Sequence, residues 1–391
     1  MLDPFYDDFL KDEHRLFYET CLRFAREEIA PHAVEWEEAE CFPRELYQKA
    51  AQAGILGASF PTAYGGATDE HDPFLAIITT EALLQGGSTG VVVGLGSLGI
   101  ALPPIMFLGT EAQKQRFVPP VLAGEKIAAL AVTEPGAGSD VAGIRTRAVR
   151  DGDDYILNGT KTFITSGVRA DQITVLARTG DDPHGGLTFF VVEKDMPGYT
   201  VSRSLKKMGW RASDTAELSF DDVRVPAANR LGPEGSGFLA VMQNFQNERL
   251  GLAAYAVASA EIALAEAENW AREREAFGRR LMDFQVTRHK LARMATRVRA
   301  ARTFTYQVAR RMQQGHDAVE AVSECKNFAC DVAQEVCYEA VQIFGGMGYM
   351  RETFVERLYR DVRLLPIGGG TSEIMNEIIS RVRGYGRRDS R

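Results

Sequence analysis

Two stretches in the C-terminal part of the chain keep a helical pattern for more than 25 residues each, Phe238–Arg274 and Phe284–Gln314. A third such stretch, Ala318–Phe344, follows them, and a short terminal helix is expected from Ser372. Long helices with short connections favour an antiparallel bundle. Residues 236–391 are therefore predicted to form a C-terminal four-helix-bundle domain.

The N-terminal part of the chain also has helical spacing, but its helices are shorter and proline residues separate them. This pattern predicts an N-terminal α-helical domain over residues 1–127. The expected helices are Glu13–Ile29, Arg44–Ala53, Pro73–Leu84 and Glu111–Leu122.

Between these helical parts lie short runs rich in Val, Ile, Thr, Phe and Tyr, separated by Gly, Asn or Asp. Arg150–Asp154 has the sequence of a hairpin turn. Because no helices intervene, residues 128–235 are predicted to form a middle antiparallel β-barrel or sandwich domain, and the fold class is α+β. The expected strands are Ala128–Thr133, Ile144–Arg150, Tyr155–Leu157, Thr162–Thr165, Ile173–Ala177, Leu187–Val192, Tyr199–Ser202 and Ala216–Phe220.

Composition excludes several classes of protein. The 391 residues carry a formal charge of −8 with no basic cluster, so a nucleic-acid partner is not expected. The segment from Glu81 to Glu111 has no charged residue, but its glycines and the Pro103-Pro104 pair favour a buried helix beside an apolar pocket over a membrane span. Five cysteines and an acidic N-terminus, unlike a targeting peptide, predict a cytoplasmic protein with reduced thiols. A mature protein from which a presequence had been removed is the alternative, because it would have the same features.

Several motifs resemble known sites without the context that those sites need. Gly86–Gly90 matches a nucleophile elbow, but the residues before it are expected to be helical rather than a strand. Gly136 and Gly138 begin a dinucleotide fingerprint that lacks its third glycine. The spacing of Cys325, Cys330 and Cys337 does not suit a metal knuckle, so no metal site is predicted.

Two loops are suited to holding a ligand. Ala131–Asp140 ends a strand in a segment rich in Gly, Ser and Thr, which brings backbone N–H groups and hydroxyls close to a bound molecule. Gly368–Ser372 precedes a helix, whose first N–H groups lack partners within the helix. A plain turn and a simple N-cap at Thr371 or Ser372 are the alternatives.

Taken together, five segments in this order and spacing resemble the acyl-CoA dehydrogenase family of flavoproteins, and the resemblance covers nearly the whole chain. It implies FAD bound between the middle domain and the bundle, with its adenosine diphosphate part reaching a neighbouring subunit. The segments are Thr133–Asp140, Phe163–Thr165, Arg274–Gly278, Gln342–Gly346 and Gly370–Glu373.

The resemblance also assigns residues to the cofactor. Thr133, Phe163, Thr165 and Thr371 would flank the isoalloxazine end, and Arg274, Phe277, Gln285, Gln342 and Gly346 would hold the diphosphate and adenine side across the subunit interface. Further cofactor contacts are expected at Leu130, Val132, Gly138, Ser139, Ile164, Gly345 and Glu373.

The catalytic base is expected on a helix of the bundle. Many family members carry Glu directly before Gly-Thr-Ser, but this chain has Gly369 there. A subgroup that includes the long-chain and isovaleryl enzymes takes its base from an E-R-L sequence, which matches Glu248–Leu250 here. The residues around Glu248 support this choice independently, because Val241, Phe245, Leu252 and Tyr255 place it within an apolar stripe that should raise its pKa.

The resemblance implies α,β-dehydrogenation of an acyl-CoA thioester to the trans-2-enoyl-CoA, with Glu248 removing the α-proton and the flavin accepting the hydride. Electrons would pass to an electron-transferring flavoprotein, and the protein would serve fatty acid β-oxidation as a homo-oligomer, in this family a tetramer. Ser139, Gln246, Asn247, Arg249 and the backbone of Gly369 would contact the acyl-CoA.

Two rival functions remain at this stage. An acyl-CoA oxidase would share the fold and the flavin but pass electrons to O₂. Chain length favours the dehydrogenase, because the common oxidases carry a further C-terminal domain. The other rival is a flavin-bearing acyl-CoA binder that lost catalysis with the glutamate at position 369.

Overall fold

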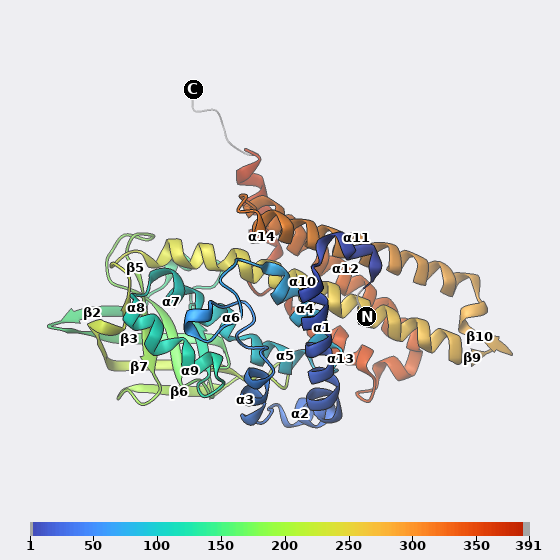
Figure 1. Cartoon of the computed structure of the whole chain (residues 1–391), viewed down its shortest axis with the longest axis horizontal. Coiled ribbons are helices and arrows are strands. Elements are labelled where there is room, and N and C mark those ends of the chain that lie inside the picture. Colours follow the sequence, from blue (N-terminus) through green and yellow to red (C-terminus); the bar gives the residue numbers. More distant parts are fainter. Residues whose placement is uncertain (1–2, 386–391) are drawn as a thin grey trace.

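Helices, strands and again helices follow one another along the chain in the computed structural model, which describes residues 3–385. Figure 1 shows the β-sheet at one end of the molecule, with one long helix running from the sheet to the other end and two further long helices packed along its second half. The N-terminal helices lie beside both the sheet and the long helices. The N-terminal helices are α1 (Asp12–Phe24), α2 (Ala33–Ala39), α3 (Glu45–Gln52), α4 (Pro73–Leu84), α5 (Thr89–Gly96), α6 (Leu98–Ala101), α7 (Pro103–Leu108), α8 (Glu111–Phe117) and α9 (Pro119–Leu122).

The expected N-terminal helices are all present, with local differences. Helix α4 has the expected bounds, whereas the helix predicted over Glu13–Ile29 changes at Ala25 into a wider π-helical turn. The helix predicted over Glu111–Leu122 divides into α8 and α9, because Pro119 has no N–H to continue the first of them.

Two apolar stretches are long enough to cross a membrane by length and composition, Thr89–Leu108 and Gly237–Glu273. Within their most apolar windows, 61% and 67% of the residues are buried inside the protein. Burial of this kind is typical of core helices, and the first stretch is divided among the short helices α5, α6 and α7.

The middle region forms one sheet in the order β6-β7-β3-β2-β4-β5-β8, with β1 paired to β4. The predicted hairpin is confirmed, because Asp151 pairs with Asp154. Most pairs are antiparallel, but β1 runs parallel to β4, and β2 also meets β4 in parallel at Arg147 and Arg178, so the sheet is mixed. The strands are β1 (Ala128–Ala131), β2 (Arg147–Asp151), β3 (Asp154–Thr165), β4 (Gln172–Arg178), β5 (Leu187–Glu193), β6 (Tyr199–Ser204), β7 (Thr215–Pro226) and β8 (Arg230–Leu231).

Two of the predicted strands, Tyr155–Leu157 and Thr162–Thr165, are parts of the single strand β3. Gly159 hides this continuity in the sequence, since glycine suggests a turn. In the structure it marks a register shift, and a β-carbon at Gly159 would lie 2.5 Å from the Thr146 hydroxyl oxygen. Only glycine fits there without displacing β2.

The C-terminal region is the predicted helical bundle. The predicted long helices match the observed ones to within one residue at each end. The sequence analysis missed α13 and a two-residue ribbon, β9 (Glu275–Ala276) with β10 (Arg279–Arg280), which joins α10 to α11. The helices are α10 (Gly237–Glu273), α11 (Gln285–Gln313), α12 (Val319–Phe344), α13 (Phe354–Asp361) and α14 (Ser372–Val382).

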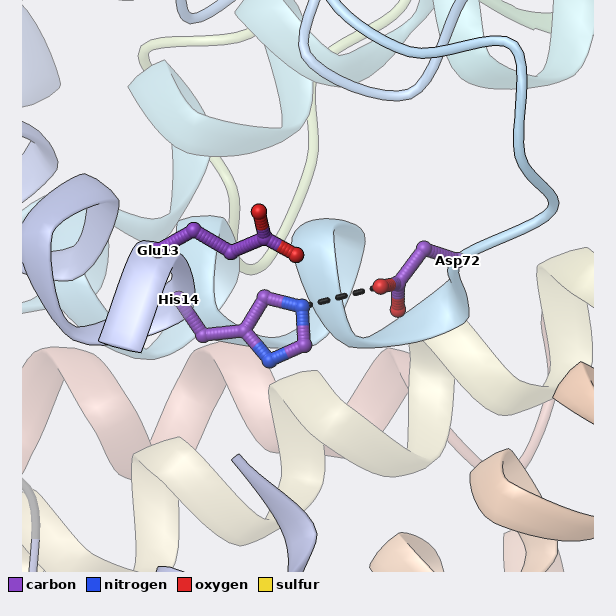
Figure 2. A group of neighbouring side chains, drawn as sticks. All are labelled: Glu13, His14 and Asp72. Carbon is purple, nitrogen blue, oxygen red and sulfur yellow. Dashed lines mark hydrogen bonds and ion pairs between the residues drawn. The ribbon is translucent and has the colours of Figure 1, made fainter. Parts of the chain in front are cut away.

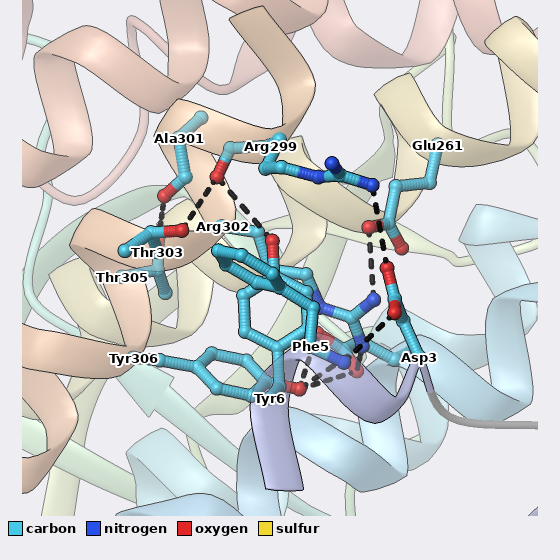
Figure 3. Close-up of polar contacts among 11 residues, drawn as sticks. Asp3, Phe5, Tyr6, Glu261, Arg299, Ala301, Arg302, Thr303, Thr305 and Tyr306 are labelled. Atoms are coloured by element: carbon cyan, nitrogen blue, oxygen red, sulfur yellow. Dashed lines mark hydrogen bonds and ion pairs between the residues drawn. The ribbon is translucent and has the colours of Figure 1, made fainter. Parts of the chain in front are cut away.

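A buried ionic cluster joins the N-terminal helices to the bundle. The Arg302 guanidinium donates to Glu81 at 2.6 Å and to Glu261 at 2.9 Å, and the Tyr306 hydroxyl donates to Glu81 at 2.9 Å. Figure 3 shows Arg302 and Glu261 beside the first residues of the described chain, where Tyr6 packs on Tyr306. This cluster fixes α4, α10 and α11 relative to one another.

Candidate functional site

Glu248 lies in the fourth turn of α10, and its side chain is only partly exposed. Val241 and Leu252 on the same stripe are buried, as the periodicity predicted. Burial raises the pKa of the Glu248 carboxyl, and the positive charges of Arg249 and Lys326 oppose only part of that rise. A carboxyl with a raised pKa is well suited to act as a general base.

The loop before α14 meets Glu248. Gly369 has a φ of 63°, and a β-carbon built on it would lie 3.3 Å from Oε1 of Glu248 and 2.5 Å from Cδ1 of Leu252. The absence of a side chain at this position therefore leaves room for the carboxyl of Glu248. Within residues 3–385, the N–H of Gly369 has no hydrogen-bond acceptor. The site thus combines a carboxylate with a nearby N–H donor.

Two cationic side chains hold this loop. Nε of Arg249 donates to the carbonyl oxygen of Gly369 at 3.3 Å, and Nζ of Lys326 donates to the carbonyl oxygen of Gly370 at 2.8 Å. No ion pair joins Arg249 to Glu248 among the described residues. Sequence reasoning missed Lys326, although it occupies an apolar stripe of α12 beside Val322 and Ala329, and the same periodicity argument would have found it.

Thr371 is the N-cap of α14, because its hydroxyl accepts the N–H of Ile374 at 3.3 Å. This was the alternative to a ligand contact. Capping uses the hydroxyl as an acceptor. Glu373 is exposed in the first turn of the same helix, where its own backbone N–H and then the Thr371 hydroxyl lower the pKa of its carboxyl.

The predicted segments around Thr133 and Phe163 lie side by side. The N–H of Thr162 donates to the carbonyl oxygen of Thr133 at 2.9 Å. Beneath them, Nζ of the fully buried Lys161 donates to the Val132 carbonyl oxygen at 2.8 Å and to Glu134 at 2.9 Å. A buried cation and carboxylate therefore fix the Thr133 loop against β3.

Burial alone would raise the pKa of Glu134, but Lys161 and the N–H groups of Arg145 and Thr146 hold it below its ordinary value. Burial in turn lowers the pKa of Lys161 to about 8. The pair is thus ionised near neutral pH and stabilises the loop as a paired, hydrogen-bonded unit.

Two of the predicted cofactor residues are exposed aromatic side chains on a left-handed backbone. Phe163 has a φ of 60° and is 69% exposed, and Phe277 has a φ of 55° and is 96% exposed. For a bulky residue this conformation is strained, and strain of this kind gathers at functional sites. Exposed rings of this kind offer large apolar faces to a ligand or partner.

The other predicted cofactor residues near Thr133 differ in accessibility. Ile164 and Val132 are buried, so only their backbone atoms can reach a ligand. Leu130 and Thr165 are partly exposed. Gly138 and Ser139 are exposed in the loop that follows Thr133, and among the predicted substrate residues Asn247 is exposed and Gln246 partly so.

The second predicted group lies at the other end of the bundle. At about 1.5 Å per residue, Glu248 and Arg274 are about 39 Å apart along the axis of α10. Phe277 lies in the β9–β10 ribbon, which Figure 1 shows at the far end from the sheet. One chain therefore does not bring the two predicted groups together. Arg274, Phe277, Gln285, Gln342, Gly345 and Gly346 are all exposed.

Three glycines, in α5, α6 and α10, have little or nothing near the place where a side chain would lie. Gly96 and Gly99 are exposed although they belong to an otherwise buried segment. A β-carbon on Gly96 would touch only the Tyr255 hydroxyl, at 3.4 Å, and β-carbons on Gly99 or Gly251 would meet nothing within 4 Å. These three glycines leave room along the same helix that carries Glu248.

One group of potential metal ligands occurs among the described residues, Glu13, His14 and Asp72 (Figure 2). Nδ1 of His14 accepts the N–H of Lys11 at 3.2 Å, so Nε2 carries the proton and donates to Asp72 at 2.9 Å. Both ring nitrogens are thus already engaged, and the group links the N-termini of α1 and α4. The link between the two helices therefore accounts for the position of these three side chains without a metal ion.

Comparison with known proteins identifies relatives over almost the whole chain. The long-chain specific acyl-CoA dehydrogenase of Sus scrofa mitochondria is 41% identical, covering 94% of this chain and 86% of its own length. Caffeyl-CoA reductase-Etf complex subunit CarC of Acetobacterium woodii is 36% identical, with 95% and 98% covered.

Solved structures agree with the fold. A probable acyl-CoA dehydrogenase from Mycobacterium abscessus has a TM-score of 0.94 and 54% identity, covering 96% of this chain and all of its own. A glutaryl-CoA dehydrogenase from Mycobacterium smegmatis in complex with FADH2 has a TM-score of 0.90 and 30% identity, with 97% and 96% covered.

A prolyl acyl carrier protein oxidase, AnaB, also matches with a TM-score of 0.89 and 32% identity, and the match covers 96% of this chain and all of that one. An oxidase of this size shows that chain length does not separate the two reaction types, contrary to the expectation from the sequence.

Family models for the acyl-CoA dehydrogenase N-terminal, middle and C-terminal domains match residues 11–125, 129–223 and 235–383. With these matches and a relative 41% identical over 94% of the chain, the protein belongs to the acyl-CoA dehydrogenase family and is an oxidoreductase of that family.

Proposed function

We propose that the protein carries out FAD-dependent α,β-dehydrogenation of an acyl-CoA thioester, with Glu248 as the base that removes the α-proton. The observation that carries this proposal is the approach of Glu248 to Gly369. A carboxylate and a backbone N–H without an acceptor among residues 3–385 belong to two elements that meet here. Proton removal from the α-carbon needs both, because the thioester oxygen gains negative charge as the proton leaves.

The residues of the chain have defined parts in this chemistry. Glu248 accepts the α-proton, and its raised pKa makes it a stronger base than an ordinary carboxylate. The N–H of Gly369 donates to the thioester oxygen, and Arg249 keeps that loop in place through the Gly369 carbonyl. Bound FAD would supply the acceptor for the β-hydrogen, which leaves as hydride.

The described residues fit a flavin dinucleotide. Beside Thr133 and Thr165, the exposed ring of Phe163 on a strained backbone offers a flat apolar surface for the isoalloxazine. Arg274, Gln285 and Gln342 offer polar and charged groups suited to a diphosphate and an adenine. The distance of about 39 Å along α10 exceeds the length of one extended FAD, which supports a site shared between two subunits.

This sharing makes a homo-oligomer part of the proposal, with the tetramer as its expected form. An electron-transferring flavoprotein is the proposed electron acceptor, supported by a relative that is named as a subunit of an Etf complex. For the substrate, we propose a long or bulky acyl chain. Gly251, one turn from Glu248 on α10, has nothing within 4 Å of where its side chain would lie, which supports this proposal.

A single set of measurements tests the proposal. Purified protein should be yellow and should release FAD, not FMN, on denaturation. Anaerobic addition of straight, branched and ring-bearing acyl-CoAs should bleach the flavin, fastest with long or bulky chains. No bleaching with any acyl-CoA would support a binder without catalysis. Rapid O₂ consumption with acyl-CoA would support an oxidase.

A further inference from the structure

Lys326 has an unusual environment for a lysine. It lies on α12, is fully buried, and its Nζ donates to the carbonyl oxygen of Gly370 at 2.8 Å. No carboxylate lies within ion-pair distance of Lys326 among the described residues. Burial lowers the pKa of its ammonium, and the charge of Glu248 opposes this fall. A buried, unpaired ammonium is costly, so a neutral donor would serve better if anchoring were its whole role.

The contact of Lys326 lies one residue from the proposed N–H donor. Gly368, Gly369 and Gly370 are consecutive, and the last two have φ values of 63° and 96°. Glycines lose more conformational entropy on ordering than other residues, so this turn depends on outside contacts for its shape. Arg249 from α10 and Lys326 from α12 supply contacts to consecutive carbonyl groups.

We propose that Lys326 is a positioning residue for the dehydrogenation, which holds the glycine turn that meets Glu248 so that the N–H of Gly369 faces the thioester. The inference rests on the proposed function. It adds that one buried cation acts on both halves of the site, the backbone donor and the carboxylate. Lys326 touches neither substrate nor cofactor in this account, and it acts through Gly370 and Glu248.

The two effects make separate predictions. A displaced N–H weakens an interaction that is strongest in the transition state, so kcat should fall while KM changes little. Loss of the cation raises the pKa of Glu248, so protonated, inactive enzyme persists to higher pH. The acid limb of the profile of kcat/KM against pH should therefore move upward.

The experiment compares Lys326→Met, which removes donor and charge at similar length, with Lys326→Gln, which keeps a donor without charge, and Lys326→Arg, which keeps both. Asn327→Ala is the matched control. Its side chain is next on α12 and donates to Ser372 and Asn376, on the same loop and helix. FAD content and thermal stability are measured for each variant.

For Lys326→Met we expect kcat to fall about 10²-fold with KM within about threefold, since a shift of about 1 Å in a reacting group has that effect. The acid limb should move to higher pH in Lys326→Met and Lys326→Gln, and return toward its wild-type position in Lys326→Arg. Hydrogen–deuterium exchange over residues 365–375 should rise in Lys326→Met, a change that is read without catalysis. Asn327→Ala should keep the wild-type pH profile.

Wild-type kcat and an unmoved acid limb in the uncharged variants would overturn the inference. If Lys326→Met does not fold, the acid limb of Lys326→Gln decides in the same way. A shift of equal size in Asn327→Ala would also overturn it, because any disturbance of this loop would then have the effect. Failure of the proposed function is a different result, namely a wild-type rate of flavin reduction in Glu248→Gln.

Discussion

A β-carbon built on Gly369 would lie 3.3 Å from Oε1 of Glu248, although Gly369 lies in the loop before α14 and Glu248 in α10, far apart in the sequence. A glutamate at position 369 would therefore place a second carboxyl in the space that Glu248 already occupies. Two carboxylates this close cannot both ionise readily. The structure thus explains how glycine at 369 and glutamate at 248 occur in the same chain.

The first prediction moves the base between these two positions. Gly369→Glu in a Glu248→Gln background should reduce its flavin at least about tenfold faster than Glu248→Gln alone, because the new carboxylate would reach the same α-proton. Leu252→Ala should improve the recovery, because Cδ1 of Leu252 lies only 2.5 Å from the new β-carbon. Flavin reduction is the measurement, and Gly369→Gln in the same background is the control without a carboxylate. Equal rates for the Glu and Gln variants would contradict a shared site.

The second prediction concerns the ion pair beneath the Thr133 loop. Lys161→Met leaves Glu134 buried without its cation, which should cost about 3–5 kcal/mol of unfolding free energy. Lys194→Met is the control, because Lys194 pairs with Asp171 from a half-exposed position and should cost about 1 kcal/mol or less. Urea unfolding measures both. A similar loss of unfolding free energy in the two variants would contradict the prediction that the buried Lys161 pair contributes more to stability than the half-exposed Lys194 pair.

The third prediction tests the shared cofactor site. Arg274→Ala should weaken FAD retention and the oligomer together, because one guanidinium would serve the diphosphate and the partner subunit. Arg272→Ala is the control, since Arg272 is a neighbouring exposed arginine that pairs with Glu268 on its own helix. Flavin absorbance and analytical ultracentrifugation are the measurements. Loss of FAD from an unchanged oligomer would place the contact within one subunit.

The fourth prediction concerns the ionic cluster of Figure 3. Burial raises the pKa of Glu261 to about 7, and the Arg302 guanidinium opposes this rise. The folded protein then holds a proton that the unfolded chain has lost, so stability falls as pH rises from the ordinary carboxyl range to about 7. Glu261→Gln should remove this decline in melting temperature. The control is Glu268→Gln on the same helix, and an unchanged slope in Glu261→Gln would contradict the assignment.

Much of the fold follows from local patterns. The helical periodicity of the sequence predicted the ends of the long helices to within one residue. Short runs rich in Val, Ile, Thr, Phe and Tyr predicted the positions of most strands. Pairing of β1 with β4 in parallel depends on contacts between distant segments, which local patterns do not report. The β9–β10 ribbon and β8 are only two residues long in each strand, too short for a periodic signal.

Some features of the candidate site could likewise be predicted from the sequence, and others could not. Glu248 was predicted from the resemblance of Glu248–Leu250 to a family sequence, with its place in an apolar stripe as independent support, and Lys326 occupies a similar stripe on α12. The left-handed backbone of Phe163 and Phe277 could not be predicted, because φ above zero in a bulky residue is imposed by surrounding structure. The distance between Thr133 and Arg274 likewise depends on the whole fold.

The most direct test of the central claim is the rate of anaerobic flavin reduction by acyl-CoA in Glu248→Gln. Glutamine keeps the packing against Val241 and Leu252 but cannot accept a proton, so fold, FAD and substrate binding should persist. Glu266→Gln is the matched control, a carboxyl of the same helix whose pKa burial also raises. The account predicts a fall of about 10²–10⁴-fold in Glu248→Gln with Glu266→Gln near wild type. A wild-type rate in Glu248→Gln would contradict it.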